Sequence, residues 1–231
     1  MDLFAIKELL LITPLILLAL TVHEVAHGWV AEKFGDNTAR IMGRITLNPI
    51  AHLDPMGTLL MFLAHFGWAK PVPVDPRRLN DPKKDMVWIS LAGPGSNIIL
   101  AALFGIGLRL SVRPAVEAGV LHGGSFLGLL IALMILGMEI NLGLGLFNLI
   151  PIHPLDGSKI VQGLLPLNQA YEYQKMERYG TMIIFTIFLF EMMTHVPILS
   201  FILRWPMGIL AQAFSGMHYS SLMRMLGVLL L

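Results

Sequence analysis

The chain contains no cysteine among its 231 residues. This absence excludes a disulfide framework, a cysteine nucleophile and a zinc-thiolate site, so a bound metal would need histidine and carboxylate ligands. Charge is also scarce, because Asp, Glu, Lys and Arg make up 13% of the residues, against about 25% in an average soluble domain. The formal net charge is only +1. With no Lys/Arg-rich run beside it, this balance excludes nucleic acid as a partner.

Long apolar runs are abundant instead, and 55% of the residues are hydrophobic. A bilayer-spanning helix needs about 20 mainly apolar residues, and four segments meet that need. We expect spans at residues 9–34, 86–110, 126–150 and 181–203. The fold class is therefore an all-α polytopic membrane protein, and we treat residues 1–231 as a single membrane-embedded domain. Nothing in the sequence indicates an oligomeric state.

The loop at residues 36–85 is the only long polar connection. Ile41, Ile45 and Leu47 alternate there with Thr and Arg, which favours a short strand or a β-hairpin. The apolar segment 56–68 is too short to span and suits a re-entrant or interfacial position. Near the other end of the chain, the mixed tail after residue 203 predicts an interfacial helix or a broken fifth span.

Basic residues are distributed unevenly between the loops. Eight lie from Lys33, at the end of the first span, to Lys84, whereas only Arg109 and Arg113 lie around the connection between the second and third spans. The positive-inside rule then places the first and third loops in the cytoplasm. The C-terminal ends of spans one and three emerge on that side, so their polar motifs can meet there. We expect a multi-pass membrane protein whose polar motifs lie toward the cytoplasm.

The end of the first span reads HEVAH. His23 and His27 are one helical turn apart on the same face, so both imidazoles can bind one metal ion. Glu24 can reach a water molecule at that metal, which is the arrangement of two zinc ligands and a general base in H-E-x-x-H. Ionisable groups inside a membrane span indicate a functional site. The pattern predicts one zinc ion per chain.

A catalytic zinc ion needs a third protein ligand and an open position. The best candidate is Asp156, because PLDG forms a Pro-bounded, Gly-terminated turn at the end of span three. The chain offers four further candidates for this ligand: His153, His52, Asp54 and Glu139. His52 and Asp54 could also hydrogen-bond to a metal ligand and orient it, or they could simply form a capped turn.

These motifs resemble the signature of the site-2 protease family of intramembrane zinc metalloproteases, in its small bacterial or archaeal branch without a PDZ domain. The resemblance is carried by HEVAH, AGPGSN and FNLIPIHPLDG, supported by GRITLNPIAHLDPMGT and GWAKPVPVDPRRL. It implies a three-helix catalytic core at about residues 9–160, followed by one or two further helices at about residues 161–231, in a prokaryotic cell membrane with the active site toward the cytoplasm.

The resemblance also implies residue roles. His23, His27 and Asp156 would be the zinc ligands and Glu24 the catalytic base. Asn148 and Asn97 match the family's two asparagines, which could contact the substrate or the oxyanion or could bond helix to helix. His153 stands where many relatives have proline, so a role as rival ligand or as support for a ligand stays open.

The implied activity is hydrolysis of peptide bonds in or next to a transmembrane segment, with a membrane-protein substrate and the lipid bilayer as partners. Two alternatives are a zinc peptidase that acts on cytosol-facing chains and an ion or proton transporter with a His/Asp metal site. The first would take its third ligand from a later glutamate such as Glu172 or Glu177. Against the transporter stands the lack of paired broken helices.

Overall fold

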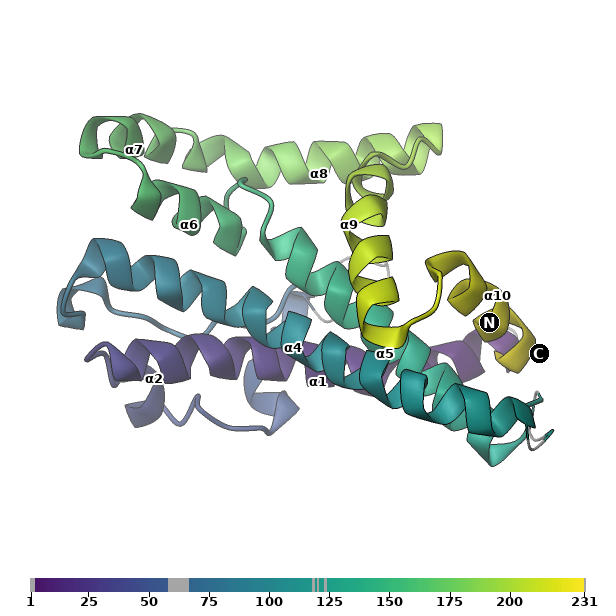
Figure 1. Ribbon diagram of the computed structural model, residues 1–231. Coiled ribbons are helices and arrows are strands. Elements are labelled where there is room, and N and C mark those ends of the chain that lie inside the picture. The colour runs from purple at the N-terminus through teal and green to yellow at the C-terminus, as the bar shows by residue number, and fades with distance from the viewer. Residues whose placement is uncertain (1–2, 58–66, 118, 120, 123, 231) are drawn as a thin grey trace. The chain divides into compact units, whose positions relative to one another are not determined.

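The computed structural model describes residues 3–57, 67–117, 119, 121, 122 and 124–230, and most of these residues are helical (Figure 1). The α-helices are α1 (Leu3–Lys33), α2 (Thr38–Ile41), α4 (Pro82–Glu117), α5 (Phe126–Asn148), α6 (Asp156–Leu164), α7 (Leu167–Gln174), α8 (Glu177–Thr194), α9 (Ile198–Ser215) and α10 (Tyr219–Leu230). Two 3-10 helices, η1 (Pro49–His52) and η2 (Pro76–Arg78), lie between α2 and α4. The all-α class is thereby confirmed.

Among the described residues, four helical segments are long and apolar enough to cross a membrane: Leu10–Lys33, Pro82–Glu117, Phe126–Asn148 and Ile198–Ser215. The first three confirm the spans expected at residues 9–34, 86–110 and 126–150. They arise because each apolar run supplies the roughly 20 residues that a bilayer requires. Together with the family relationship given below, they make the chain an integral membrane protein.

The fourth span differs from the one that the sequence predicts. Instead of one helix over residues 181–203, α8 ends at Thr194 and α9 begins at Ile198. His195 adopts the left-handed conformation with φ 56°, and its N–H donates to the carbonyl of Glu191. Pro197 follows two residues later, and a proline disfavours the helical conformation of the residue before it. The predicted tail is thus divided between α9 and α10, which is 12 residues long.

The β-hairpin expected between spans one and two is also wrong. In the described part of this loop, β pairing is limited to one isolated antiparallel bridge between Leu53 and Ala69. Local hydrogen bonds from side chains to the backbone take the place of β-sheet pairing here. The side chain of Asp36 accepts from the backbone N–H of Thr38, and that of Asn48 accepts from the backbone N–H of Ile50. The proposed re-entrant segment at 56–68 falls mostly on residues 58–66, which lie outside the described residues.

The chain forms two compact units. The first contains Met1–Ala19, Asn97–Leu146 and Pro197–Leu231. Its core joins the second half of α4 to α5, α9 and α10 through side chains that are almost fully buried. They include Leu108, Ile131, Ile135, Met138, Leu142, Ala211 and Leu222. This core is apolar, as expected for helices that pack against one another in a membrane protein.

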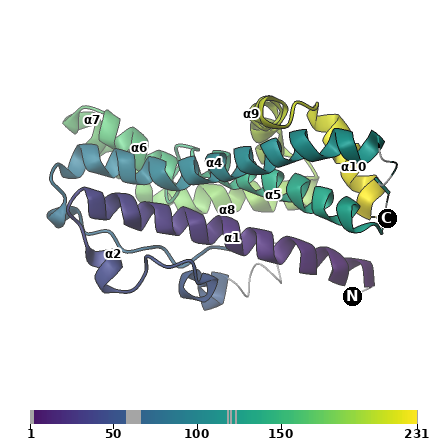
Figure 2. The same ribbon diagram turned by 60° about the horizontal axis from the view of Figure 1, so that its bottom comes forward.

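The second unit contains Leu20–Ser96 and Phe147–Val196. Within it, α6 lies beside the first half of α4 in both views (Figures 1 and 2). The Lys83 ammonium donates to the carbonyl of Leu165 at 2.6 Å. A Cβ added to Gly163 would lie 2.3 Å from Val87 Cγ2, so this approach requires glycine. The last turns of α1 run along the same half of α4, and all the metal-site candidates except Asn97 and Glu139 belong to this unit.

Candidate metal centre

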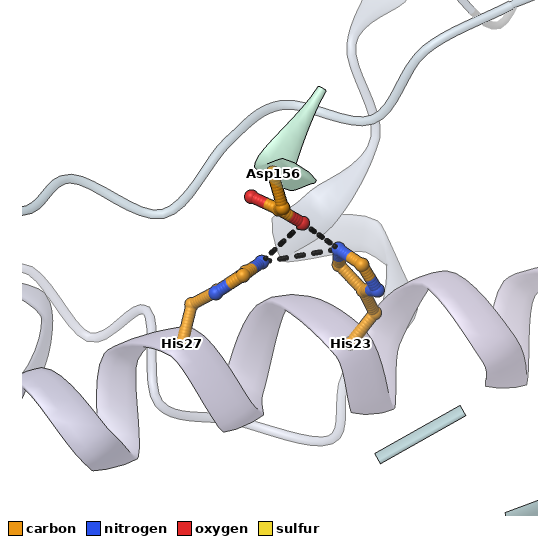
Figure 3. A group of neighbouring side chains, drawn as sticks. All are labelled: His23, His27 and Asp156. Carbon is orange, nitrogen blue, oxygen red and sulfur yellow. Dashed lines mark hydrogen bonds and ion pairs between the residues drawn. The ribbon is translucent and has the colours of Figure 1, made fainter. Parts of the chain in front are cut away.

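Two histidines and one aspartate meet inside the second unit. His23 and His27 project from the same face of α1, and Asp156 opposes them from the first residue of α6 (Figure 3). All three are buried, with 5%, 9% and 7% of their surfaces exposed. The structure therefore brings together the two motifs that lie about 130 residues apart in the sequence.

Three potential ligand atoms form a small triangle. The Nε2 atoms of His23 and His27 are 3.0 Å apart, and each lies 3.1 Å from Oδ2 of Asp156. Zinc binds such atoms at 2.0–2.2 Å, so two ligands in a tetrahedral site stand roughly 3.4 Å apart. The triangle is thus close to the size that a zinc ion requires. Among the described residues, this is a group that could hold a metal ion.

The protonation of His27 supports a cation at this point. Its Nδ1–H donates to the backbone carbonyl of Ile89 at 2.6 Å, which leaves Nε2 of the neutral ring without a proton. That nitrogen then faces the Asp156 carboxylate oxygen at 3.1 Å, and two acceptor atoms repel each other unless a proton or a metal ion lies between them. A carbonyl that fixes the ring in this way is the usual support of a metal-binding histidine.

Gly93 of α4 provides the space beside the two rings. A Cβ added to this residue would lie 2.3 Å from Nε2 of His27 and 2.6 Å from Nε2 of His23. Real Cβ atoms do not come so close, so only glycine can occupy this position without a shift. The missing side chain leaves room next to the ligand atoms, as a bound ion and a reacting carbonyl would require.

Asp156 is fixed by its place at the start of α6. The positive end of the helix dipole favours a carboxylate there. Burial works to raise the pKa of the Asp156 carboxyl, but when protons occupy the facing nitrogens of His23 and His27, their hydrogen bonds and charges outweigh burial and hold the pKa well below its usual range. The carboxylate is therefore ionised and able to bind a metal. A Cβ on Gly157 would lie 2.2 Å from the Leu149 carbonyl oxygen, so the Asp-Gly sequence is sterically required.

Glu24 lies on α1 next to His23 and is 9% exposed. Its Oε2 accepts a hydrogen bond of 2.7 Å from the backbone N–H of Val72. Val72 belongs to the Pro-rich segment that precedes η2. Glu24 is outside the triangle of ligand atoms, which agrees with a role other than metal binding.

The two predicted asparagines have different surroundings. Asn97 is fully buried in the first unit, where its side-chain Nδ2 donates to the Ala19 carbonyl at 3.1 Å and to Oδ1 of Asn141 at 2.9 Å. These bonds tie α1, α4 and α5 together and favour the helix-to-helix alternative. Asn148 is the last residue of α5 and is half-buried in the second unit. Substrate or oxyanion contact stays a prediction for both.

His52 and His153 are buried but lie outside the metal triangle. Nε2 of His52 is 2.9 Å from the Thr46 carbonyl oxygen, so the ring stabilises the turn before η1. Nδ1 of His153 is 3.0 Å from Oγ of Ser158, and its ring packs against that of Tyr173. His153 thus braces the turn that carries Asp156. A role of either histidine toward the metal stays a prediction.

The remaining ligand candidates do not belong to the triangle. Asp54 accepts from the backbone N–H of Gly57 at 2.8 Å, which is the capped turn expected as one alternative. Glu139 accepts from the Tyr219 hydroxyl at 2.6 Å in the first unit. Glu172 pairs with Lys175, and Glu177 lies exposed at the start of α8.

Two features of this site are not predicted by the sequence pattern. They are the space at Gly93 and the hydrogen bond from Val72. Both residues contribute through the backbone, so the chemistry of their side chains gives no signal. The only sequence signal is positional, since AGPGSN and KPVPV are Gly- and Pro-rich segments in a chain that carries a metal motif.

Comparisons with known proteins agree with the geometry. A family model described as peptidase family M50 matches residues 119–191, which include Asp156. YwhC of Bacillus subtilis, named as a candidate zinc metalloprotease, is 41% identical over 192 residues, which are 83% of this chain and 83% of YwhC.

More distant relatives carry the same kind of name. Rip2 of Mycolicibacterium smegmatis, also named as a candidate zinc metalloprotease, is 32% identical over 148 residues. The match covers 61% of this chain and 52% of Rip2, so the chain spans about half the length of that relative. Rip2 of Mycobacterium tuberculosis is 33% identical over 147 residues, with the same coverage. No solved structure matches the chain.

Proposed function

The chain belongs to peptidase family M50, the site-2 protease family, and is a zinc metalloendopeptidase, and we propose that it hydrolyses peptide bonds in or next to transmembrane segments of other membrane proteins. The observation that carries this proposal is the position of the metal triangle. Two of its three residues lie on a helix that is long and apolar enough to cross a membrane. A substrate peptide bond can reach these residues only beside this apolar helix, where a transmembrane segment of the substrate would lie.

In this proposal, His23, His27 and Asp156 hold the zinc ion and Glu24 is the catalytic base. Their separations of 3.0–3.1 Å and the fixed Nδ1–H of His27 support the three ligands. The burial of Glu24 beside His23, outside the triangle, supports a proton-transfer role.

The zinc ion, when bound, supplies Lewis acidity that polarises the scissile carbonyl and makes water more acidic. Glu24 then takes the proton from the attacking water and delivers it to the leaving amine, a transfer worth about 10²- to 10⁴-fold in rate. The hydrogen bond from His27 Nδ1–H to the Ile89 carbonyl fixes the ring so that Nε2 is the nitrogen turned toward the metal position. Burial of all four side chains excludes bulk water from these charges.

A substrate helix presents a second problem, because each of its backbone groups is already hydrogen-bonded and none can be left unpaired in lipid. The helix must unwind locally before a carbonyl can reach the site. We therefore expect cleavage near helix ends or near Gly and Pro residues, where unwinding costs least. The eight basic residues from Lys33 to Lys84 support a site toward the cytoplasm.

Variants of the full-length protein in lipid nanodiscs test the residue roles. Glu24→Gln should keep one zinc ion per chain and lose at least about 100-fold in kcat, as expected for a general base. His23→Ala and Asp156→Asn should lose zinc on dialysis together with activity. Glu172→Gln is the matched control, because this exposed carboxylate pairs only with Lys175 among the contacts of the described residues. Full activity in Asp156→Asn would refute the ligand assignment.

The location of the scissile bond needs a separate measurement. Membranes that contain the active enzyme or Glu24→Gln are compared by mass spectrometry of newly formed N-termini. We expect the new termini of the active sample to fall inside or beside transmembrane segments. New termini confined to soluble proteins would instead support the peptidase that acts on cytosol-facing chains.

A further inference from the structure

The general base is held by a backbone group from a distant segment. Oε2 of Glu24 accepts the N–H of Val72 at 2.7 Å, and the two residues are 48 positions apart. Both are buried, with 9% and 8% of their surfaces exposed. A hydrogen bond to an ionised acceptor is shorter and stronger than a neutral one.

The sequence around Val72 makes this donor unique within its tripeptide. Pro71 and Pro73 have no backbone N–H, so Val72 carries the only donor of the Pro-Val-Pro sequence. Proline at 73 also restricts Val72 to an extended conformation, as proline at 71 restricts Lys70. The segment is therefore stiff, and its single donor points at the carboxylate.

Contacts on both sides of Val72 fix the segment in place. The N–H of Lys70 donates to the carbonyl of His52 at 2.9 Å, and its carbonyl accepts from Arg44 at 2.7 Å. The N–H of Asp75 donates to the buried carboxylate of Asp36, just after α1, at 2.7 Å. The Val72 N–H is thus anchored independently of its bond to Glu24.

The Val72 side chain packs against α1 one turn beyond Glu24. A Cβ added to Gly28 would lie 3.0 Å from Cγ1 of Val72, so glycine lets the segment approach the helix closely. The Val72 side chain determines how closely the segment packs on α1, and the Val72 N–H donates the hydrogen bond to Glu24. These two contributions can be separated by experiment.

We propose that the backbone N–H of Val72 is the positioning group of the catalytic base. It binds Oε2 and thereby limits the rotation of the Glu24 carboxylate, which leaves the other oxygen for proton transfer. The Pro-Val-Pro sequence supplies this single donor on a stiff support. The proposal rests on the proposed role of Glu24, and it adds a group that acts through that residue without touching the substrate.

The test replaces the backbone N–H of Val72 by an oxygen atom. The α-hydroxy analogue of valine, inserted at position 72 of the full chain by suppressor tRNA, replaces the N–H with an ester oxygen and keeps the side chain. The matched control inserts the same analogue at Val74, two residues along the same segment. Val72→Ala is the complementary variant, because it keeps the N–H and shortens the side chain that faces Gly28.

Five quantities are measured for each zinc-loaded protein in detergent micelles: zinc per chain, the thermal unfolding midpoint, kcat and KM on labelled β-casein, and Kd for acetohydroxamic acid. Casein is unfolded, so its cleavage requires no helix unwinding. Acetohydroxamic acid releases a proton when it chelates zinc, and a neighbouring base must accept it. Its affinity therefore reports on Glu24 without any turnover.

We expect the ester at 72 to lower kcat about 10- to 100-fold, as misplaced catalytic groups do, with KM and zinc content unchanged. It should weaken acetohydroxamic acid binding as Glu24→Gln does. The ester at 74 should retain kcat within about threefold, and Val72→Ala, which keeps the N–H, should lower kcat less than the ester at 72 does. Added to Glu24→Gln, the ester at 72 should lower kcat no further.

Opposite results would overturn the proposal. An ester at 72 with normal kcat and hydroxamate affinity would show that the N–H does not position the base. Loss of zinc or folding in that ester, or an equal loss of kcat in Val72→Ala, would show that the segment serves packing alone. Normal activity in Glu24→Gln would instead refute the role of Glu24 itself, so the two failures are distinguishable.

Discussion

The substitution Gly93→Ala adds one methyl group at the centre of the metal site. The new Cβ would lie 2.3 Å from Nε2 of His27 and 2.6 Å from Nε2 of His23. Contacts between nonbonded heavy atoms of this size are favourable at about 3.5 Å. The two ring nitrogens or the helix α4 must therefore move by about 1 Å.

That displacement is large compared with what a zinc site tolerates. Ligand distances in zinc sites stay within about 0.2 Å of their ideal values. A shift of 1 Å in one or both histidines therefore removes ligands from the ion, and we expect zinc affinity and kcat to fall at least about 100-fold. Overpacking of this kind also costs about 1 to 3 kcal/mol of stability.

Gly95→Ala is the matched control for this prediction. Gly95 lies in the same helix and the same AGPGSN motif, and nothing lies within 4 Å of a Cβ added there. Replacing a helical glycine with alanine gains about 1 kcal/mol, so this variant should be at least as stable as the native protein. Zinc per chain after dialysis, peptidase activity and the unfolding midpoint are measured for both. Normal zinc affinity and activity in Gly93→Ala would refute the packing on which this reasoning rests.

Two further predictions concern buried polar groups outside the metal triangle. Burial works to raise the pKa of Asp36, but hydrogen bonds from Thr38 and Asp75 outweigh burial and lower the pKa. The ionised Asp36 carboxylate therefore stabilises the fold fully at pH values above the ordinary aspartate pKa near 4. This stabilisation is lost as pH falls through the lowered pKa of the folded state. Asp36→Asn should lower the unfolding midpoint at pH 7, because about 2 kcal/mol of hydrogen bonding is lost. The midpoints of the variant and the native protein should converge below pH 4. A difference between them that stays constant with pH would contradict this prediction. Asn97→Ala should lower stability by about 1 to 3 kcal/mol with kcat nearly unchanged, whereas a 100-fold loss of kcat at normal stability would favour the oxyanion role.

The sequence predicts the features that depend on side-chain type and on runs of apolar residues. Three of the four expected spans are correct because each run exceeds the bilayer thickness. The sequence pattern also groups His23, His27 and Asp156, because helical spacing aligns the histidines and topology brings the aspartate to the same side. In the fold, the three residues form the triangle of atoms that could hold a metal ion.

The errors in the hairpin and in the fourth span have a common physical cause, which is the local conformation that single residues impose on the backbone. Asp36 bonds to the N–H of Thr38 and so replaces the expected hairpin by the short helix α2. Pro197 ends a continuous apolar run that hydropathy alone reads as one span. The pairing of Asn97 with Asn141 joins residues 44 positions apart, and no local pattern predicts such a contact.

The metal site shows why the ionisable groups of α1 are tolerated in an apolar helix. A charged or polar group in lipid must be paired, since no water is available to solvate it. His27 is paired with the Ile89 carbonyl, and Glu24 with the Val72 N–H. Both partners are backbone groups of other segments, brought close because Gly28 and Gly93 have no side chains. It follows that HEVAH and an aspartate transferred alone to another pair of membrane helices would not reproduce this site, because the glycines supply its space and the Pro-Val-Pro segment supplies the hydrogen bond to Glu24.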